Sequence, residues 1–294
     1  MLKKVLSTAA PRDGIAIALG AGGARGLAHI VVLEALDELG VRPVAISGSS
    51  MGAIIGAAYA AGIPAKDIRS HIQRMFGSRR RTYSGLLKAR VGRFADLFRG
   101  RSANPVLIDA EMLLGAFWPP DVPAWFEDLQ IPFSAVATDY RNRRSVAFES
   151  GLLTPAVAGS IALPGLVRPV LVDGMVLVDG GLTDPLPYRA LSRRAGIVIA
   201  SDVTGSIAAR HRRPPRPYQA MIGGAQIVQF ALTQEMLKSD RPDVVIQPEV
   251  GHFRALDFFK ANDILAAANS ARDDVKKALA VYLESDHVSS ALTI

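Results

Sequence analysis

The stretch PVAISGSSMGAIIGAAYAAG at residues 43–62 combines a short apolar strand, a tight turn and an alanine-rich helix. We expect the strand over Pro43–Ser47 and the helix from Met51 onward. The pentapeptide GSSMG at 48–52 joins them and has the pattern G-x-S-x-G. A sharp strand-to-helix turn needs small residues around its serine, and it exposes the hydroxyl beside the N–H groups of a helix start. The pattern predicts a nucleophilic Ser50, and the alternative is a turn that only needs glycines.

A glycine-rich loop precedes this turn. The apolar run Ile15–Leu19 has the length of a strand, residues 20–26 read GAGGARG, and Leu27–Leu36 has the pattern of a helix. Consecutive glycines at a helix start leave N–H groups open to a phosphate or to the oxyanion of an acyl-transfer intermediate. The loop lacks the Gly-Lys-Ser/Thr ending of a P-loop, and Arg25 replaces the last glycine of a dinucleotide fingerprint. We therefore expect an oxyanion hole, with helix packing as the alternative.

A third candidate is Asp179, which ends the short apolar strand Val176–Val178 and is followed by Gly180 and Gly181. The two glycines let another part of the chain approach this carboxylate closely. A carboxylate at a strand end in such a place suits a general base for a serine. The alternative is an ordinary Asp-Gly turn, which is our interpretation of residues 173–174.

In this order the three segments resemble the patatin-like phospholipases, and most closely their compact bacterial members. That family has a G-G-G-x-R/K-G loop, a G-x-S-x-G turn and a D-G-G/A motif. The corresponding segments here are residues 21–26, 48–52 and 179–181, and the flanking stretches SIALPG (160–165) and TDPLP (183–187) also match. The resemblance covers roughly residues 14–202, with Ala21 as a departure from the first loop glycine.

The resemblance implies a serine lipid acyl hydrolase that cleaves fatty-acyl esters of (lyso)phospholipids with a Ser–Asp dyad and without a metal or cofactor. Asp179 would take the proton of Ser50 as Ser50 attacks the ester, and water would then release the fatty acid. Burial would raise the pKa of Asp179 and make it a better base. Backbone N–H groups would hold the oxyanion at Gly22, Gly23 and Ala24. The supporting motif residues would be Arg25, Gly26, Gly48, Gly52, Gly180 and Gly181.

The competing enzyme interpretation is an α/β-hydrolase with a Ser-Asp-His triad, because Ser50, Asp179 and His252 follow its chain order. Against it, Ser50 comes very early in the chain, after one clear strand. A catalytically silent, membrane-binding regulatory module is a further alternative. The intact serine, aspartate and glycine loop favour an enzyme.

The length of 294 residues suits one α/β domain with a full core. We expect a flexible leader at 1–13 and a single catalytic domain at 14–294, built on a mainly parallel sheet with helices on both faces. The later helices are expected at Pro185–Arg194, Tyr218–Leu237 and Asn262–Leu283. The sequence has no cysteine and no apolar run long enough to span a membrane. We therefore expect a cytoplasmic protein, peripheral at the membrane.

The formal net charge is +7, and the cations are unevenly placed. Residues 76–104 contain eight Lys and Arg against one acid, and Leu87, Val91, Phe94 and Phe98 recur at helical spacing. This pattern suits an amphipathic insert or cap that lies on an anionic membrane, and the alternative is a helix packed on the core. A second basic loop spans 210–217. Because no nucleic-acid-binding motif is present, we expect a lipid or membrane-surface partner and no specific nucleic acid.

Overall fold

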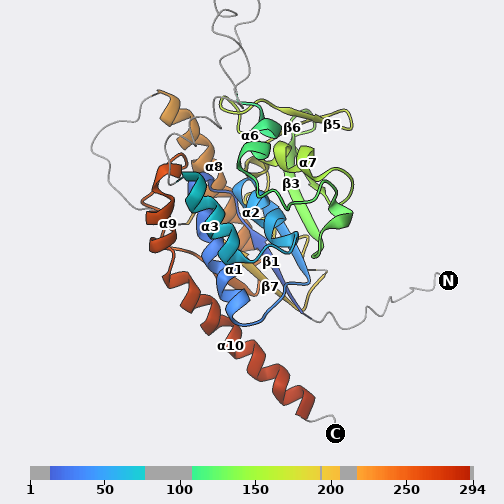
Figure 1. Cartoon of the computed structure of the whole chain (residues 1–294), viewed down its shortest axis with the longest axis vertical. Coiled ribbons are helices and arrows are strands. Elements are labelled where there is room, and N and C mark those ends of the chain that lie inside the picture. The colour runs from blue at the N-terminus through green and yellow to red at the C-terminus, as the bar shows by residue number, and fades with distance from the viewer. Residues whose placement is uncertain (1–13, 77–107, 193, 206–216, 292–294) are drawn as a thin grey trace, which may run out of the picture.

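The computed structural model describes residues 14–76, 108–192, 194–205 and 217–291 (Figure 1). The expected leader at 1–13 lies outside these ranges. So do the basic insert expected at 76–104, apart from Phe76, and the basic loop up to residue 216.

An apolar strand forms the centre of the sheet. β1 (Ile15–Leu19) is buried along its whole length, because both faces of the sheet are covered. It pairs in parallel with β2 (Ala45–Ser49) on one side and with β7 (Ile197–Ser201) on the other. β3 (Phe133–Asp139) extends the parallel set beyond β2, and β8 (Val244–Ile246) extends it beyond β7. The carboxyl ends of these strands therefore meet at one edge of the sheet.

Antiparallel strands complete the sheet beside β3. β4 (Arg144–Phe148) and β6 (Met175–Val178) both pair antiparallel with β3, and β5 (Val170–Val172) forms a hairpin with β6. The eight strands have the order β5-β6-β3-β2-β1-β7-β8, with β4 paired to β3. The predicted α/β class with a mainly parallel sheet is confirmed, and so is the turn at 173–174, where both residues have positive φ.

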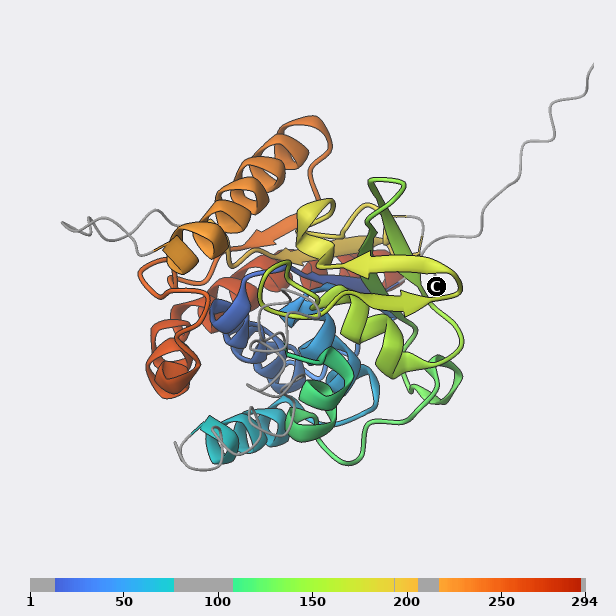
Figure 2. The same cartoon turned by 90° about the horizontal axis from the view of Figure 1, so that it is seen from above.

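The helices cover the two faces of the sheet unequally (Figure 2). Alternate residues of β1 point to opposite faces: Ile15, Ile17 and Leu19 enter a large core, whereas Ala16 and Ala18 enter a smaller one. The smaller core also contains Met236 of α8. The longer helices are α1 (His29–Glu38), α2 (Met51–Ala60), α3 (Ala65–Phe76), α6 (Ala110–Phe117), α7 (Leu153–Ser160), α8 (Pro217–Ser239), α9 (Ala261–Ala267) and α10 (Ser270–Ala291).

Two expected helices differ from the structure. Residues 185–192 form turns and bends instead of a helix, because Pro185 and Pro187 remove backbone donors and restrict the residues before them. The single helix expected at Asn262–Leu283 is two helices, α9 and α10, which are separated at residues 268–269. The break lets α9 pack against the glycine-rich segment while α10 packs against α1.

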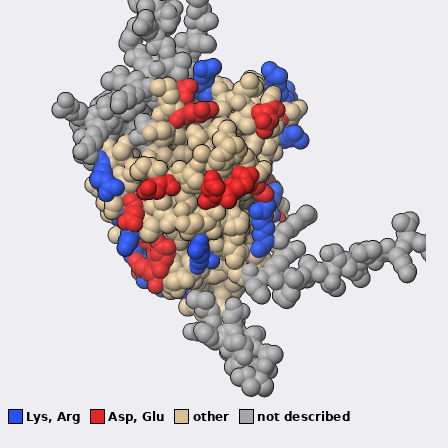
Figure 3. Space-filling view, turned by 45° about the vertical axis from the view of Figure 1, so that its right-hand side comes forward, with Lys and Arg blue, Asp and Glu red and all other residues tan. Residues whose placement is uncertain are grey.

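The surface of the described residues carries charges of both signs. On the face in Figure 3, groups of Asp and Glu lie among Lys and Arg and broad uncharged areas. Glu34 of α1 accepts hydrogen bonds from Arg69 of α3 at 2.5 Å and from Arg272 of α10 at 2.6 Å, which ties three helices together. Among the described helices, none combines the length and the apolar character that crossing a membrane requires.

Candidate active site

The register of the sheet brings Ser50 and Asp179 to the same level. The last residue of β2 pairs with Val136 of β3, and the last residue of β6 pairs with Thr138. Ser50 and Asp179 each follow their strand by one residue, and β6 runs opposite to β3. Both therefore reach the level of Ala137 on the same side of β3, because β4 pairs with its other side.

Ser50 occupies a strained turn. Its φ of 54° and ψ of −119° lie in a region that L-residues rarely adopt. The Ser50 N–H donates to Ser160 Oγ at 2.9 Å, and Ser160 Oγ donates to the Val136 carbonyl at 2.5 Å. These bonds hold the turn from the end of α7. The sequence marked Ser160 only as part of a matching stretch, so its contact with the turn was not anticipated.

Gly52 packs directly against β1, and a Cβ there would overlap the Leu19 carbonyl. The atoms that a Cβ would meet are backbone atoms of Leu19 and Gly20, which cannot move aside as a side chain can. We therefore expect Gly52→Ala to lower the free energy of unfolding by about 3 kcal/mol or more, which is the upper end of the cost of overpacking a core. Urea denaturation measures this change. The control is Gly223→Ala on α8, where a Cβ meets nothing within 4 Å and stability should rise by up to about 1 kcal/mol. If the two variants had equal free energies of unfolding, the backbone around residue 52 would accommodate a Cβ at little cost, which would contradict the prediction.

The side chains of Ser50 and Asp179 are hydrogen-bonded. Ser50 Oγ donates to Asp179 Oδ2 at 2.7 Å, and the two residues are 9% and 2% exposed. Burial raises the pKa of Asp179 to about 6, although hydrogen bonds from Ser50 and from the Gly181 N–H oppose the rise. A carboxylate with a pKa near 6 accepts a proton from a serine more readily than one at the ordinary value of about 3.9.

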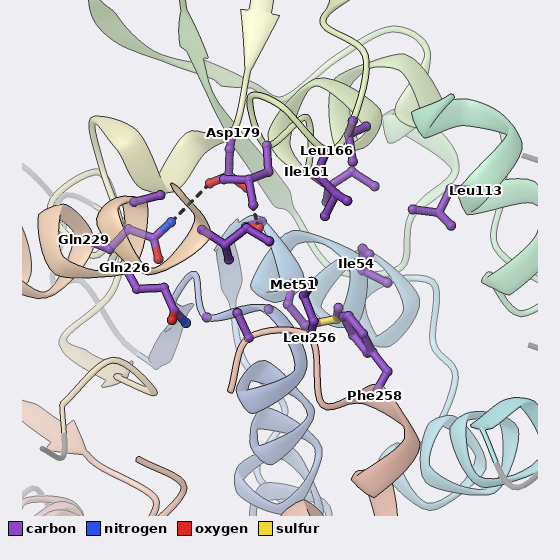
Figure 4. A pocket seen from close by; sticks show the side chains of 18 residues that line it. Met51, Ile54, Leu113, Ile161, Leu166, Asp179, Gln226, Gln229, Leu256 and Phe258 are labelled. Atoms are coloured by element: carbon purple, nitrogen blue, oxygen red, sulfur yellow. Dashed lines mark hydrogen bonds between the residues drawn. The ribbon is translucent and has the colours of Figure 1, made fainter. Parts of the chain in front are cut away.

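The second oxygen of Asp179 has partners of its own. Oδ1 accepts from the Gly181 N–H at 2.8 Å and from Gln229 Nε2 at 3.5 Å (Figure 4). Thr138 Oγ1 donates to the Asp179 carbonyl at 2.8 Å and fixes the backbone. One carboxylate oxygen is thus anchored while the other faces Ser50. Gln229 was not anticipated, because it lies within a long helix and no motif surrounds it.

The glycine loop lies beside Ser50 and corrects one expectation. Gly22 and Gly23 line the same cavity as Ser50. Gly23 has a φ of +57°, and a Cβ there would lie 2.5 Å from the Ala255 carbonyl oxygen, so glycine is required. Ala24 was expected to be an oxyanion donor, and this is wrong. Its N–H already donates to the Ala255 carbonyl at 2.7 Å, which anchors the loop to the C-terminal part of the chain.

Arg25 of the loop and His29 at the start of α1 are buried. Arg25 is 7% exposed; burial lowers its pKa and the charge of Asp202 opposes this. His29 Nε2 donates to the Gly20 carbonyl at 2.8 Å, and its Nδ1 accepts from Ser201 Oγ at 2.8 Å. Burial lowers the pKa of His29 to about 4, so the ring stays neutral and positions the start of the loop.

The other motif glycines are places of close packing. Gly26 lies against Met51, Gly48 against Gly52, Gly180 against Val136, and Gly181 against Ala21. The departure at Ala21 is therefore accommodated by the missing side chain of Gly181 opposite.

His252 lies apart from this pair. It is exposed, its ring centroid is 4.1 Å from that of Phe253, and it does not line the cavity at Ser50. Among the described residues, the Asp179 carboxylate accepts hydrogen bonds from Ser50, Gly181 and Gln229. The geometry therefore provides no support for a Ser-Asp-His triad.

A cavity of about 120 Å³ opens at Ser50 (Figure 4). Most of its wall is aliphatic or aromatic, namely Met51, Ile54, Leu113, Ile161, Leu163, Leu166, Val167, Ile222, Leu256 and Phe258. The polar side chains in the wall are Ser50, Asp179, Gln226 and Gln229. An apolar wall with a few convergent polar groups is typical of a ligand site. Within the described ranges, no three His, Cys, Asp or Glu side chains come together as metal ligands.

Known proteins are similar to this chain over about two thirds of its length or more. An uncharacterized NTE family protein of Mycobacterium bovis is 41% identical over 204 residues, which are 69% of this chain and 52% of that protein. Lysophospholipase NTE1 of Mycosarcoma maydis is 33% identical over 216 residues, which are 71% of this chain and 10% of that protein. The chain thus spans about half the length of the mycobacterial relative and a tenth of the fungal one.

Among solved structures, VipD from Legionella pneumophila aligns with a TM-score of 0.48 and 14% identity, over 93% of this chain and 67% of that one. The family model described as patatin-like phospholipase matches residues 17–192, which include Ser50, Asp179 and the glycine loop. Because this match covers more than half of the chain, the chain belongs to the patatin-like phospholipase family.

Proposed function

We propose that the protein is a serine hydrolase of fatty-acyl esters, with Ser50 as nucleophile and Asp179 as general base. The observation that carries the proposal is the 2.7 Å hydrogen bond from Ser50 Oγ to Asp179 Oδ2 at the wall of an apolar cavity. The family membership and a relative named as a lysophospholipase support the same assignment.

In the proposed reaction, Asp179 Oδ2 takes the proton of Ser50 as Oγ attacks the carbonyl carbon of the ester. The oxyanion forms beside Gly22 and Gly23, whose N–H groups stabilise it. Asp179 then protonates the departing alcohol, which leaves an acyl-enzyme. Water enters, loses a proton to the same carboxylate and attacks the acyl carbonyl. Collapse of this intermediate releases the fatty acid, and Ser50 recovers its proton.

Gln229 serves as a positioning residue in this scheme. Together with the Gly181 N–H it holds Asp179 Oδ1, so that Oδ2 stays directed at Ser50 through both half-reactions. Because Gln229 is neutral, it orients the carboxylate without adding a charge to the cavity.

The substrate of the proposal is a (lyso)phospholipid or a similar lipid ester, because the cavity wall offers hydrocarbon contacts to a fatty-acyl chain. We place the protein in the cytoplasm, at the surface of an anionic membrane. Contact with a membrane surface is supported by exposed apolar side chains: Leu256 lines the cavity and is 39% exposed, and Met221 and Phe259 are 48% and 42% exposed. Sedimentation with vesicles of anionic and of neutral lipid tests this placement, and equal absence of binding to both would contradict it.

A fluorophosphonate probe tests the proposed function most directly. Intact-mass analysis should show one adduct on the wild type and on His252→Ala, because the activated serine requires no histidine. Hydrolysis of a lysophospholipid should follow the same pattern. A folded wild type that takes up no probe and cleaves no ester would refute the proposal, and loss of labelling in His252→Ala would restore the triad.

The proposal predicts an acidic limb in the pH profile. Asp179 must be deprotonated to act as a base, and burial raises its pKa to about 6. We therefore expect kcat/KM to be level above pH 6 and to fall about tenfold per pH unit well below it. Asp184→Asn is the matched control, because burial also raises the pKa of Asp184 to about 6 but this residue does not line the cavity. If the acidic limb moved in Asp184→Asn, the pKa in the profile would belong to Asp184 and not to Asp179.

A further inference from the structure

The cavity contains one polar group that the proposed reaction leaves without a role. The side-chain nitrogen of Gln226, Nε2, is shielded from solvent and has no hydrogen-bond partner among the described residues. Gln226 nevertheless lines the cavity at Ser50. Buried polar atoms are nearly always paired, so an unpaired donor at a ligand site requires an explanation.

The neighbours of Gln226 on α8 show that its position is specific. Ile222, Ala225, Gln226 and Gln229 recur at helical spacing and all line the cavity. Gln229 has a partner, since its amide donates to Asp179. Gln226 faces the same space without one, although a leucine of similar volume would avoid the cost of an unpaired amide.

The arrangement of the wall indicates what Gln226 meets. Figure 4 shows Leu113, Ile54 and Phe258 on one side of Asp179, and Gln226 on the other. A fatty-acyl chain laid along the apolar side directs the alcohol part of the ester toward α8. The oxygens of that alcohol part are hydrogen-bond acceptors, which the free donor of Gln226 lacks.

We propose that Gln226 donates a hydrogen bond to an oxygen in the alcohol part of the ester and so selects glycerol-type esters over simple alkyl esters. This inference rests on the proposed function and adds that Gln226 determines which esters are preferred. A hydroxyl and a phosphate ester both supply such an oxygen, and both lie within the reach of one amide.

The test compares three octanoyl esters with the same acyl chain. Propyl octanoate has no further oxygen, 1-octanoylglycerol has hydroxyls, and 1-octanoylpropanediol 3-phosphate has a phosphate without a hydroxyl. We expect Gln226→Leu to lower kcat/KM about 10- to 100-fold for an oxygen-bearing ester and less than about threefold for propyl octanoate. The ester that loses activity identifies the oxygen. Gln234→Leu, the same change on α8 outside the cavity wall, should leave all three rates unchanged.

Two results would overturn the inference. An equal loss on all three esters would make Gln226 a structural residue, and no loss on any ester would remove it from substrate binding. Propyl octanoate separates this inference from the proposed function. If the wild type cleaves it and takes up the fluorophosphonate probe, hydrolysis stands whatever Gln226 does, whereas failure of both refutes the hydrolase itself.

Discussion

Ser50→Ala is expected to abolish ester hydrolysis, with kcat reduced at least about 10⁴-fold. Loss of the nucleophile of a serine protease costs about 10⁶ in kcat. No second hydroxyl side chain lines the described cavity wall, so nothing there can replace Ser50. Steady-state hydrolysis of 1-octanoylglycerol measures the loss, and intact-mass analysis should show that the fluorophosphonate adduct disappears as well.

The neighbouring serine provides the matched control. Ser49 lies in the same pentapeptide, and its buried Oγ has no hydrogen-bond partner among the described residues. Ser49→Ala should therefore keep activity within about threefold of the wild type, since a lone hydroxyl contributes little. Circular dichroism should show that both variants are folded. If Ser49→Ala were inactive and Ser50→Ala active, the nucleophile would be misassigned.

Asp179→Asn is expected to reduce kcat about 10⁴-fold while the protein stays folded. Asparagine has the size of aspartate, but its amide cannot take the proton of Ser50; the same change at the aspartate of a Ser-His-Asp triad, where it orients the histidine, costs about 10⁴ in kcat. The change also replaces a carboxylate whose burial raises its pKa to about 6, so we expect the melting temperature to be kept or raised.

Initial rates and thermal melting together test this expectation. Asp184→Asn makes the same chemical change at a second buried carboxylate with a raised pKa, and it should keep wild-type rates. An Asp179→Asn protein that retained a tenth or more of the activity would place the general base elsewhere. A protein that lost activity because it unfolded would show this in its melting curve.

Much of the fold and of the site could be predicted because the signals are local. The strand at Ile15–Leu19 and the helix after Ser50 follow from apolar runs and small residues within a few positions of each other. The position of Asp179 in the sheet, level with Ser50, could not be predicted from such local signals. It depends on β6 running antiparallel to β3, and that pairing joins segments about 40 residues apart.

The errors have the same cause. Ala24 has the sequence context of a free N–H, but its partner is the carbonyl of Ala255, far along the chain. Gln226 and Gln229 lie in a helix that was correctly expected, yet no local pattern tells which face of that helix turns toward Ser50. Distant contacts of this kind are fixed by tertiary packing, which overrides local propensity.

The cavity wall combines residues from two parts of the chain. The proposed catalytic pair and the glycine loop lie within residues 17–192, whereas Ile222, Gln226, Leu256 and Phe258 come from beyond that range. Substitutions at Ile222, Gln226, Leu256 and Phe258 can change which substrates the cavity admits without removing a hydrogen bond to Asp179 or to the glycine loop. Substrate preference is therefore open to redesign at these four positions, whereas Gln229 and Ala255 of the same segment must be kept, because they hold Asp179 and the glycine loop.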